Sequence, residues 1–151
     1  MKSKGIGLVL VLVILLAGCG TTTQVSTSLY VTRSESLPGY RFAPFERTVT
    51  NTTAVQQLYA AALVLPSPQP GAIYHCPNDI GLEYHLSFYG DRFTIKHMDL
   101  DATGCGWLFL NQTEARITTD SFRSLVVKTI GIPCLFPSAC VLFRKIFGEL
   151  T

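Results

Sequence analysis

CPNDIGLEYHLSFYGDRFTIKHMDLDATGC, residues 76–105, is the stretch that decides the fold. Apolar and polar side chains alternate between residues 83 and 89, and they alternate again after the pair Gly90-Asp91. Alternation with a period of two on both sides of a Gly-X pair predicts a β-hairpin with a type II′ turn. With Tyr89 and Arg92 flanking the turn, the expected cross-strand pairs are Phe88 with Phe93, Leu86 with Ile95, and Tyr84 with His97.

The N-terminus has the pattern of an export signal. Lys2 and Lys4 precede an apolar run over residues 6–16, which leads into Leu16-Ala17-Gly18-Cys19. Such a pattern is typical of a secretory signal peptide, and the run is too short for an ordinary transmembrane helix. Leu-Ala-Gly-Cys resembles the lipobox of bacterial lipoproteins, whose cysteine is diacylated after the signal is cut off. We therefore expect residues 1–18 to be a signal peptide and Cys19 to carry lipid. The alternative is an uncleaved anchor with an incidental cysteine.

Removal of the signal changes the charge of the chain. The full sequence has 12 basic and 10 acidic residues, and loss of Lys2 and Lys4 makes the two numbers equal. No cluster of Lys or Arg remains to follow a phosphate backbone, so nucleic-acid binding has no support. At 151 residues the chain has the length of one domain.

Four cysteines remain once Cys19 is lipidated. In an exported chain they allow three disulfide pairings, which spacing alone does not decide. We expect Cys76–Cys105 and Cys134–Cys140, because each bond closes a local unit. The competing arrangement joins Cys76 to Cys134 or Cys140 and ties the C-terminal segment to the hairpin.

Residues 19–39 are expected to form a tether and residues 40–133 the folded domain. The first range is rich in Thr and Ser and has little apolar periodicity, which is typical of a solvated linker. Within it, only Leu29-Tyr30-Val31 has the composition of a short strand. A strand is expected between residues 40 and 49, and Pro44 places it at an edge or after that residue.

Two helices are expected in the domain. Asn51, Thr52 and Thr53 are candidate caps of the first helix, Thr53 with Gln56 fits a capping box, and Pro66 stops the helix. Thr119 or Asp120 caps the second helix, and Gly131 ends it. Apolar stripes normally face a core, so both helices are expected to cover the sheet rather than a partner. The stripes consist of Val55, Leu58, Tyr59 and Ala62, and of Phe122, Leu125, Val126, Thr129 and Ile130.

Two further strands are expected at residues 107–110 and 114–118, joined by a turn at Asn111-Gln112. They continue the hairpin as a meander. The expected fold class is therefore α+β: an antiparallel β-meander of about four strands, with two helices packed on one face and disulfides as staples.

Residues 134–151 are unusually apolar for a C-terminal segment. Phe143, Ile146, Phe147 and Leu150 form a helical stripe in it. We expect this segment to pack on its own domain, pinned by Cys134–Cys140. The alternative is that it lies in the membrane interface or docks onto a partner.

No metal or cofactor is expected. In the predicted register His85 and His97 lie on opposite faces of the hairpin, so they cannot share a metal ion. The chain also lacks HExxH and a paired-cysteine spacing suited to zinc. Residues 99–104 resemble the first half of a calcium loop, but Leu110 stands where that loop needs a glutamate. Asp99 and Asp101 are therefore expected to be turn residues.

No residue is assigned a catalytic role. The chain has no G-x-S-x-G motif, and the expected disulfides leave no free thiol. Local spacing places no acid–base partner near Ser87. Catalytic triads assemble across a fold, however, so a missing motif does not exclude one.

CPNDIGLEYHLSF and DATGC, with VTNTTAVQQLYAAALVLP upstream, together resemble a family of uncharacterised small bacterial lipoproteins. The shared signature is CPxDxGxxYxLxF followed by DxxGC, and the resemblance covers about residues 49–131. It implies a compact α+β domain and no known reaction, so no catalytic residue is carried over. Residues 134–151 lie outside the resemblance.

The expected function is a non-catalytic binding or structural role for a lipoprotein on the extracytoplasmic face of the cell membrane, with a protein at the cell surface as the partner. One alternative is a protein inhibitor of an extracellular enzyme, and a convex, exposed tip at residues 89–92 would favour it. The other is an enzyme with a site assembled across the fold. A cleft that collects His97, Asp99 and a third titratable residue would favour the enzyme.

Overall fold

The structure is a computed structural model, and it describes residues 25–35, 37, 43–76, 79–91 and 93–132. The expected signal peptide, the lipidation site Cys19 and the pair Cys134 and Cys140 lie outside these residues. The same holds for the whole apolar segment 134–151. These expectations therefore stay predictions.

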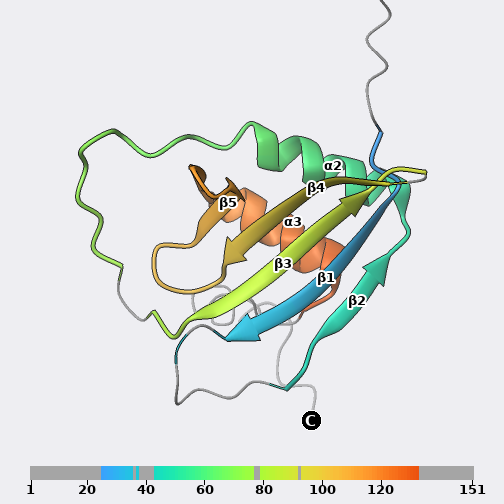
Figure 1. The fold of residues 1–151 in the computed structure, drawn as a ribbon, viewed down its shortest axis with the longest axis horizontal. Helices are drawn as coiled ribbons and strands as arrows, with labels where there is room; N and C mark the ends of the chain where they lie inside the picture. Colours follow the sequence, from blue (N-terminus) through green and yellow to red (C-terminus); the bar gives the residue numbers. More distant parts are fainter. Residues whose placement is uncertain (1–24, 36, 38–42, 77–78, 92, 133–151) are drawn as a thin grey trace, which may run out of the picture.

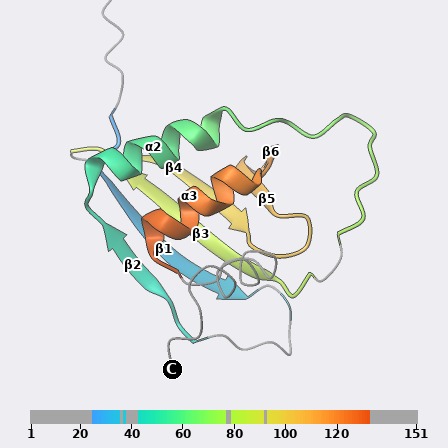
Figure 2. The same cartoon turned by 180° about the vertical axis from the view of Figure 1, so that it is seen from behind.

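In the described part of the chain, six strands form one antiparallel sheet in the order β2-β1-β3-β4-β5-β6 (Figure 1). Two helices lie on the same face of this sheet, as the opposite views of Figures 1 and 2 show. The α+β class, the antiparallel sheet and the two helices are confirmed, whereas the expectation of about four strands is wrong. The elements are β1 Ser28–Glu35, β2 Glu46–Val49, α2 Thr52–Leu63, β3 Leu82–Tyr89, β4 Thr94–Asp101, β5 Trp107–Asn111, β6 Glu114–Ile117 and α3 Asp120–Ile130.

Strand β1 occupies a stretch that was expected to be tether. It pairs with β3 along its whole length, and four of its residues also pair with β2. Leu29 and Val31 are fully buried. The tether prediction is therefore wrong for Ser28–Glu35. The possible short strand at Leu29-Tyr30-Val31 lies within β1. Three apolar residues are a weak strand signal, and their burial comes from neighbours distant in the sequence. Strand β2 starts after Pro44 at the edge of the sheet, as predicted.

The β3–β4 hairpin is present, but its register differs from the prediction. Leu86 pairs with Met98 and Tyr84 with Leu100, and the register shifts between Phe88 and Tyr89. Met98 and Leu100 are consequently buried, whereas the Phe93 side chain is 53% exposed. A change of register by an odd number of residues turns every side chain of a strand to the other face. The longer apolar alternation after residue 97 therefore fills the core.

The expected type II′ turn at Gly90-Asp91 is also wrong. Tyr89 pairs with Thr94, so the connection runs from Gly90 to Phe93. The Gly90 N–H donates a hydrogen bond to the Phe93 carbonyl at 2.9 Å. This longer connection accommodates the shifted register.

The Cys76–Cys105 disulfide is confirmed. It joins the segment before β3 to the connection between β4 and β5, with the two Cα atoms 4.6 Å apart. Entry and exit of the hairpin are thereby held at the end of the sheet opposite the β3–β4 turn.

The helix caps are partly as expected. Helix α2 is capped by Asn51, one of the three candidate caps, whose side chain accepts a hydrogen bond from the Ala54 N–H. The predicted capping box at Thr53 is wrong, because Thr53 lies inside the helix. Helix α3 is capped by Thr119 and ends at Gly131, which adopts the left-handed conformation with φ 64°.

The core lies between the helices and one face of the sheet. Both predicted stripes face it, and Tyr59 of α2 packs edge-on against Phe88 of β3 with ring centroids 5.1 Å apart. The completely or nearly buried helix residues are Val55, Leu58 and Ala62 in α2, and Phe122, Val126 and Ile130 in α3. The other sheet face carries no described helix (Figure 1). No helix of the described residues is long and apolar enough to cross a membrane.

Candidate functional site

The helix-free face of the sheet carries a hydrogen-bonded row of polar side chains across three adjacent strands. Alternation places the apolar residues of β3 in the core and sends His85 and Ser87 to the opposite face. Antiparallel pairing then sets His85 beside Asp99 and Ser87 beside His97 on β4. Polar side chains on this face are consistent with a solvated sheet surface.

Ser34, His85 and Asp99 form a continuous chain of hydrogen bonds. The Ser34 hydroxyl lies 2.7 Å from His85 Nε2, and His85 Nδ1 lies 2.6 Å from an Asp99 carboxylate oxygen. The connectivity is that of a Ser-His-Asp triad, in which the carboxylate orients the imidazole and the imidazole accepts the hydroxyl proton. The side chains of His85 and Asp99 are 41% and 55% exposed, so water competes for both.

The surroundings of Ser34 differ from those of a hydrolase nucleophile. Its backbone lies within the β1–β3 ladder, and Glu83 stands directly opposite it. Negative charge that develops on a substrate oxygen needs hydrogen-bond donors aimed at it, and a nearby carboxylate opposes that charge. The site thus has a positioned base, but Glu83 opposes the development of negative charge beside Ser34.

His97 forms a second, separate pair with Ser87, at 2.9 Å between Nδ1 and the hydroxyl oxygen. Both histidines point away from the helices, so the prediction that they lie on opposite faces is wrong, for the reason of register given above. Each ring is held by its own serine. In the part of the chain that the structure describes, no group of three His, Cys, Asp or Glu side chains is placed to hold a metal ion.

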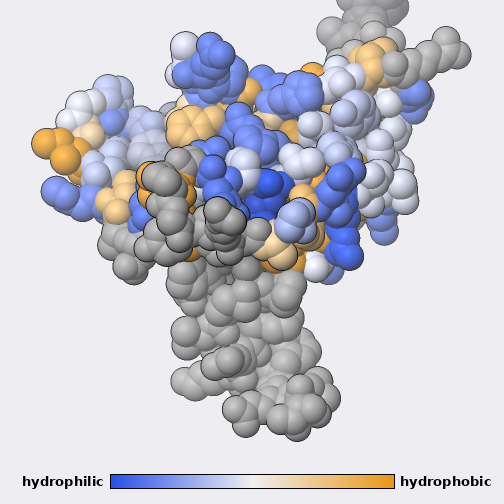
Figure 3. All heavy atoms as spheres, turned by 60° about the horizontal axis from the view of Figure 1, so that its bottom comes forward, coloured by the Kyte–Doolittle hydropathy of each residue, from blue (hydrophilic) through white to orange (hydrophobic). Residues whose placement is uncertain are grey.

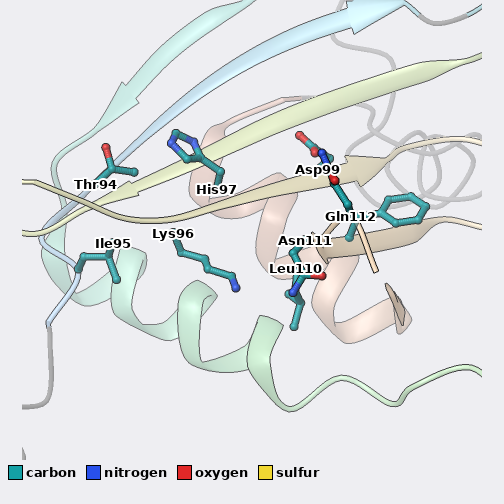
Figure 4. A pocket seen from close by; sticks show the side chains of 9 residues that line it. Thr94, Ile95, Lys96, His97, Asp99, Leu110, Asn111 and Gln112 are labelled. Carbon is teal, nitrogen blue, oxygen red and sulfur yellow. The ribbon is translucent and has the colours of Figure 1, made fainter. Parts of the chain in front are cut away.

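A shallow hollow of about 520 Å³ opens between β4 and the β5–β6 turn (Figure 4). It exists because β4 and β5 pair only at Asp99–Phe109 and Leu100–Leu108 and then separate. Lys96 extends toward Asn111 on one side of β4, while His97 stands on the other (Figure 4). The lining residues are Thr94, Ile95, Lys96, His97, Asp99, Phe109, Leu110, Asn111 and Gln112.

His97, Asp99 and Lys96 all line this hollow, although Lys96 and His97 extend from opposite sides of β4. Asp99 connects it to the row that ends at Ser34, and His97 connects it to Ser87. The hollow and the polar row therefore form one continuous surface. Ser34 itself does not line the hollow. Sequence reasoning missed Ser34, because its strand was assigned to the tether.

In the calcium-like stretch, residues 99–104, Asp101 forms a turn with the backbone that follows it. Its carboxylate accepts a hydrogen bond from the Thr103 N–H at 2.9 Å, and the Thr103 hydroxyl donates to Asp79 at 3.1 Å. Burial raises the pKa of Asp101, and the nearby charge of Asp79 adds to the rise, while the bonds from Thr103 partly offset it. Asp99, by contrast, is a strand residue held by His85, so its assignment to a turn is wrong.

At the other edge of the same face, Tyr30 of β1 lies beside Glu46 of β2. A hydrogen bond to the Glu46 carboxylate raises the pKa of the Tyr30 hydroxyl. Tyr30 is half-buried and Glu46 is exposed, and the pair forms a cross-strand contact at the sheet margin.

Comparison with known proteins identifies no relative: no family model, no curated protein and no solved structure matches the chain. The resemblance to small bacterial lipoproteins stays a prediction based on the quoted motifs.

Proposed function

We propose that the chain is a lipid-anchored extracytoplasmic protein whose domain binds an extended segment of a protein partner. The observation that carries the proposal is the separation of β4 from β5. From Thr94 to His97, β4 has no strand partner on that side within the described residues. An exposed strand edge can pair with an extended peptide, whose backbone supplies the hydrogen bonds and whose side chains enter flanking pockets.

The hollow supplies such flanking contacts. Ile95 and Phe109 offer apolar surface, and Phe109 is 40% exposed. Lys96 and Asp99 place charges of both signs beside that surface, and Asn111 offers an amide. Apolar surface with a few polar groups around it is the usual composition of a binding site.

The binding proposal is tested by a photo-crosslinking amino acid placed in the hollow of the full, exported chain in its native cell. We expect Gln112 replaced by the crosslinker to give one discrete protein adduct. The matched control is Ser124, which is exposed on α3 on the opposite layer. Equal adduct patterns from both positions, or none from Gln112, would refute a partner at the hollow.

The anchor is supported by Leu16-Ala17-Gly18-Cys19 after an apolar run. We expect a fatty acid supplied to the cells to label the wild type and to leave Cys19→Ser unlabelled. Equal labelling of the two chains would show that the lipid is not on Cys19.

A second candidate function is serine-dependent hydrolysis, which the Ser34–His85–Asp99 hydrogen bonds favour. Its test is a fluorophosphonate, which reacts with serines activated by a base. Hydrolysis requires labelling of the wild type and of Ser87→Ala but not of Ser34→Ala. An unlabelled wild type eliminates this candidate and leaves the polar row as a binding surface.

A further inference from the structure

The start of the described chain and the β3–β4 turn lie at the same end of the sheet (Figures 1 and 2). The Thr27 N–H donates a hydrogen bond to the Tyr89 carbonyl at 2.8 Å, and the Ser26 hydroxyl donates to the same oxygen at 3.4 Å. A Cβ atom built on Gly90 would lie 3.5 Å from the Val25 carbonyl oxygen. The segment that enters β1 is thus fastened to the turn.

Two large apolar side chains are exposed at this end. Val25 is 50% exposed and Phe93 is 53% exposed. Figure 3 shows apolar groups scattered among mostly polar ones on this face of the described residues. Ile73, on the long connection before β3, is 85% exposed as well. Exposure alone therefore does not identify which apolar group meets a partner.

The length of the tether decides between these groups. From Cys19 to Val25 the chain advances by six residues, which span about 20 Å at most when fully extended. The headgroup layer of a bilayer takes up about 5–7 Å of that reach. A domain of about 100 residues has a radius of gyration of about 13 Å, so its diameter exceeds the tether. A lipid on Cys19 therefore holds the Val25 end of the domain toward the membrane.

We infer that the β3–β4 turn rests on the lipid surface, with Phe93 and Val25 in contact with the membrane interface. This inference rests on the proposed lipidation of Cys19. The transfer of apolar side chains at the edge of a tethered domain from water into the membrane interface lowers the free energy. Asp91 is exposed in the same turn, and its carboxylate limits the contact to the depth of the headgroups.

The test uses the full lipidated chain in phosphatidylcholine vesicles, part of whose lipid carries bromine near the headgroup. Trp107 is the single tryptophan, so Trp107→Phe provides a silent background. In that background we expect Phe93→Trp to show a blue-shifted emission that brominated lipid quenches. Ile73→Trp in the same background is the matched control, and we expect neither effect there. Both positions are exposed, and melting curves check that both variants are folded.

Flotation of the wild type with the vesicles reports the anchor separately. If the chain floats and Phe93→Trp is quenched no more than Ile73→Trp, the orientation is wrong while the anchor stands. If the chain does not float, the anchor fails and the orientation fails with it. Quenching at Phe93→Trp alone, in a chain that floats, supports both.

Discussion

The surroundings of the Asp101 carboxyl, at the end of β4, disfavour its ionised form. Burial and Asp79 raise the pKa of this carboxyl in the folded chain. A carboxyl whose pKa is raised on folding stabilises the fold most below its unfolded pKa, and this contribution is lost as the pH rises through the folded pKa. At neutral pH the ionised Asp101 therefore lowers the free energy of unfolding.

We expect Asp101→Asn to raise the melting temperature at pH 7. The amide oxygen still accepts the hydrogen bond that the Thr103 N–H gives to Asp101. The advantage of the variant should vanish near pH 3, where the wild-type carboxyl is protonated in both states. Thermal melts at the two pH values measure this, with Asp91→Asn, an exposed carboxyl in the β3–β4 turn, as the control. A pH-independent difference would contradict the assignment.

At the scale of elements, the register of β4 decides which side chains stabilise the sheet. We expect Met98→Ala to lower the free energy of unfolding by about 2–5 kcal/mol, because it empties a buried site. His97→Ala loses a hydrogen bond to Ser87 on an exposed face and should cost about 1 kcal/mol. Denaturant unfolding of the two variants compares them. A larger loss of stability for His97→Ala than for Met98→Ala would contradict this register. It would favour the two-residue turn at Gly90-Asp91, in which His97 faces the core.

The end of α3 is tied to the edge of the sheet by Arg47 of β2, which donates a hydrogen bond to the Ile130 carbonyl at 2.6 Å. A cation at a helix C-terminus also compensates the helix dipole. Gly131→Ala would place a Cβ atom against the Arg47 guanidinium and would add the cost of a left-handed alanine, about 1–2 kcal/mol. Gly71→Ala pays only the backbone cost, because no atom lies within 4 Å of its Cβ position. Equal destabilisation of the two variants would show that Arg47 moves away freely.

At the scale of the whole molecule, the Cys76–Cys105 disulfide covalently joins distant parts of the described fold. The sequence separation of 29 residues gives a loop-closure stabilisation of about 3–4 kcal/mol. Replacement of both cysteines by alanine should therefore lower the melting temperature by about 10 °C or more. Calorimetry of the double variant measures the loss, and an unchanged melting temperature would contradict it. Peptide mapping without reductant tests whether Cys134 and Cys140 pair with each other.

The proposed orientation of the domain also bears on its proposed function. A β3–β4 turn that rests on lipid is not available to fill the active site of an extracellular enzyme, so this orientation opposes the inhibitor alternative. The hollow beside β4 begins at Thr94, next to this turn, and extends to Asn111 and Gln112 in the β5–β6 turn. A partner segment of the proposed kind would reach it from the side of the sheet.

The sequence by itself determined those features that short-range chemistry controls. Apolar periodicity placed both helices, Thr119 and Gly131 marked the limits of α3, and two outer cysteines predicted the disulfide. Each of these depends on residues close together in the chain, or on their position relative to a hairpin that is itself local.

Only the tertiary structure decided the register of β4, the place of β1 and the composition of the polar row. Alternation fits either face of a strand, and a register shift at Phe88–Tyr89 selects the one that buries Met98. The strand β1 is stable because it lies between β2 and β3, which no local pattern in Ser28–Glu35 reveals. Ser34 meets His85 across 51 residues of sequence, so their contact follows from strand order alone.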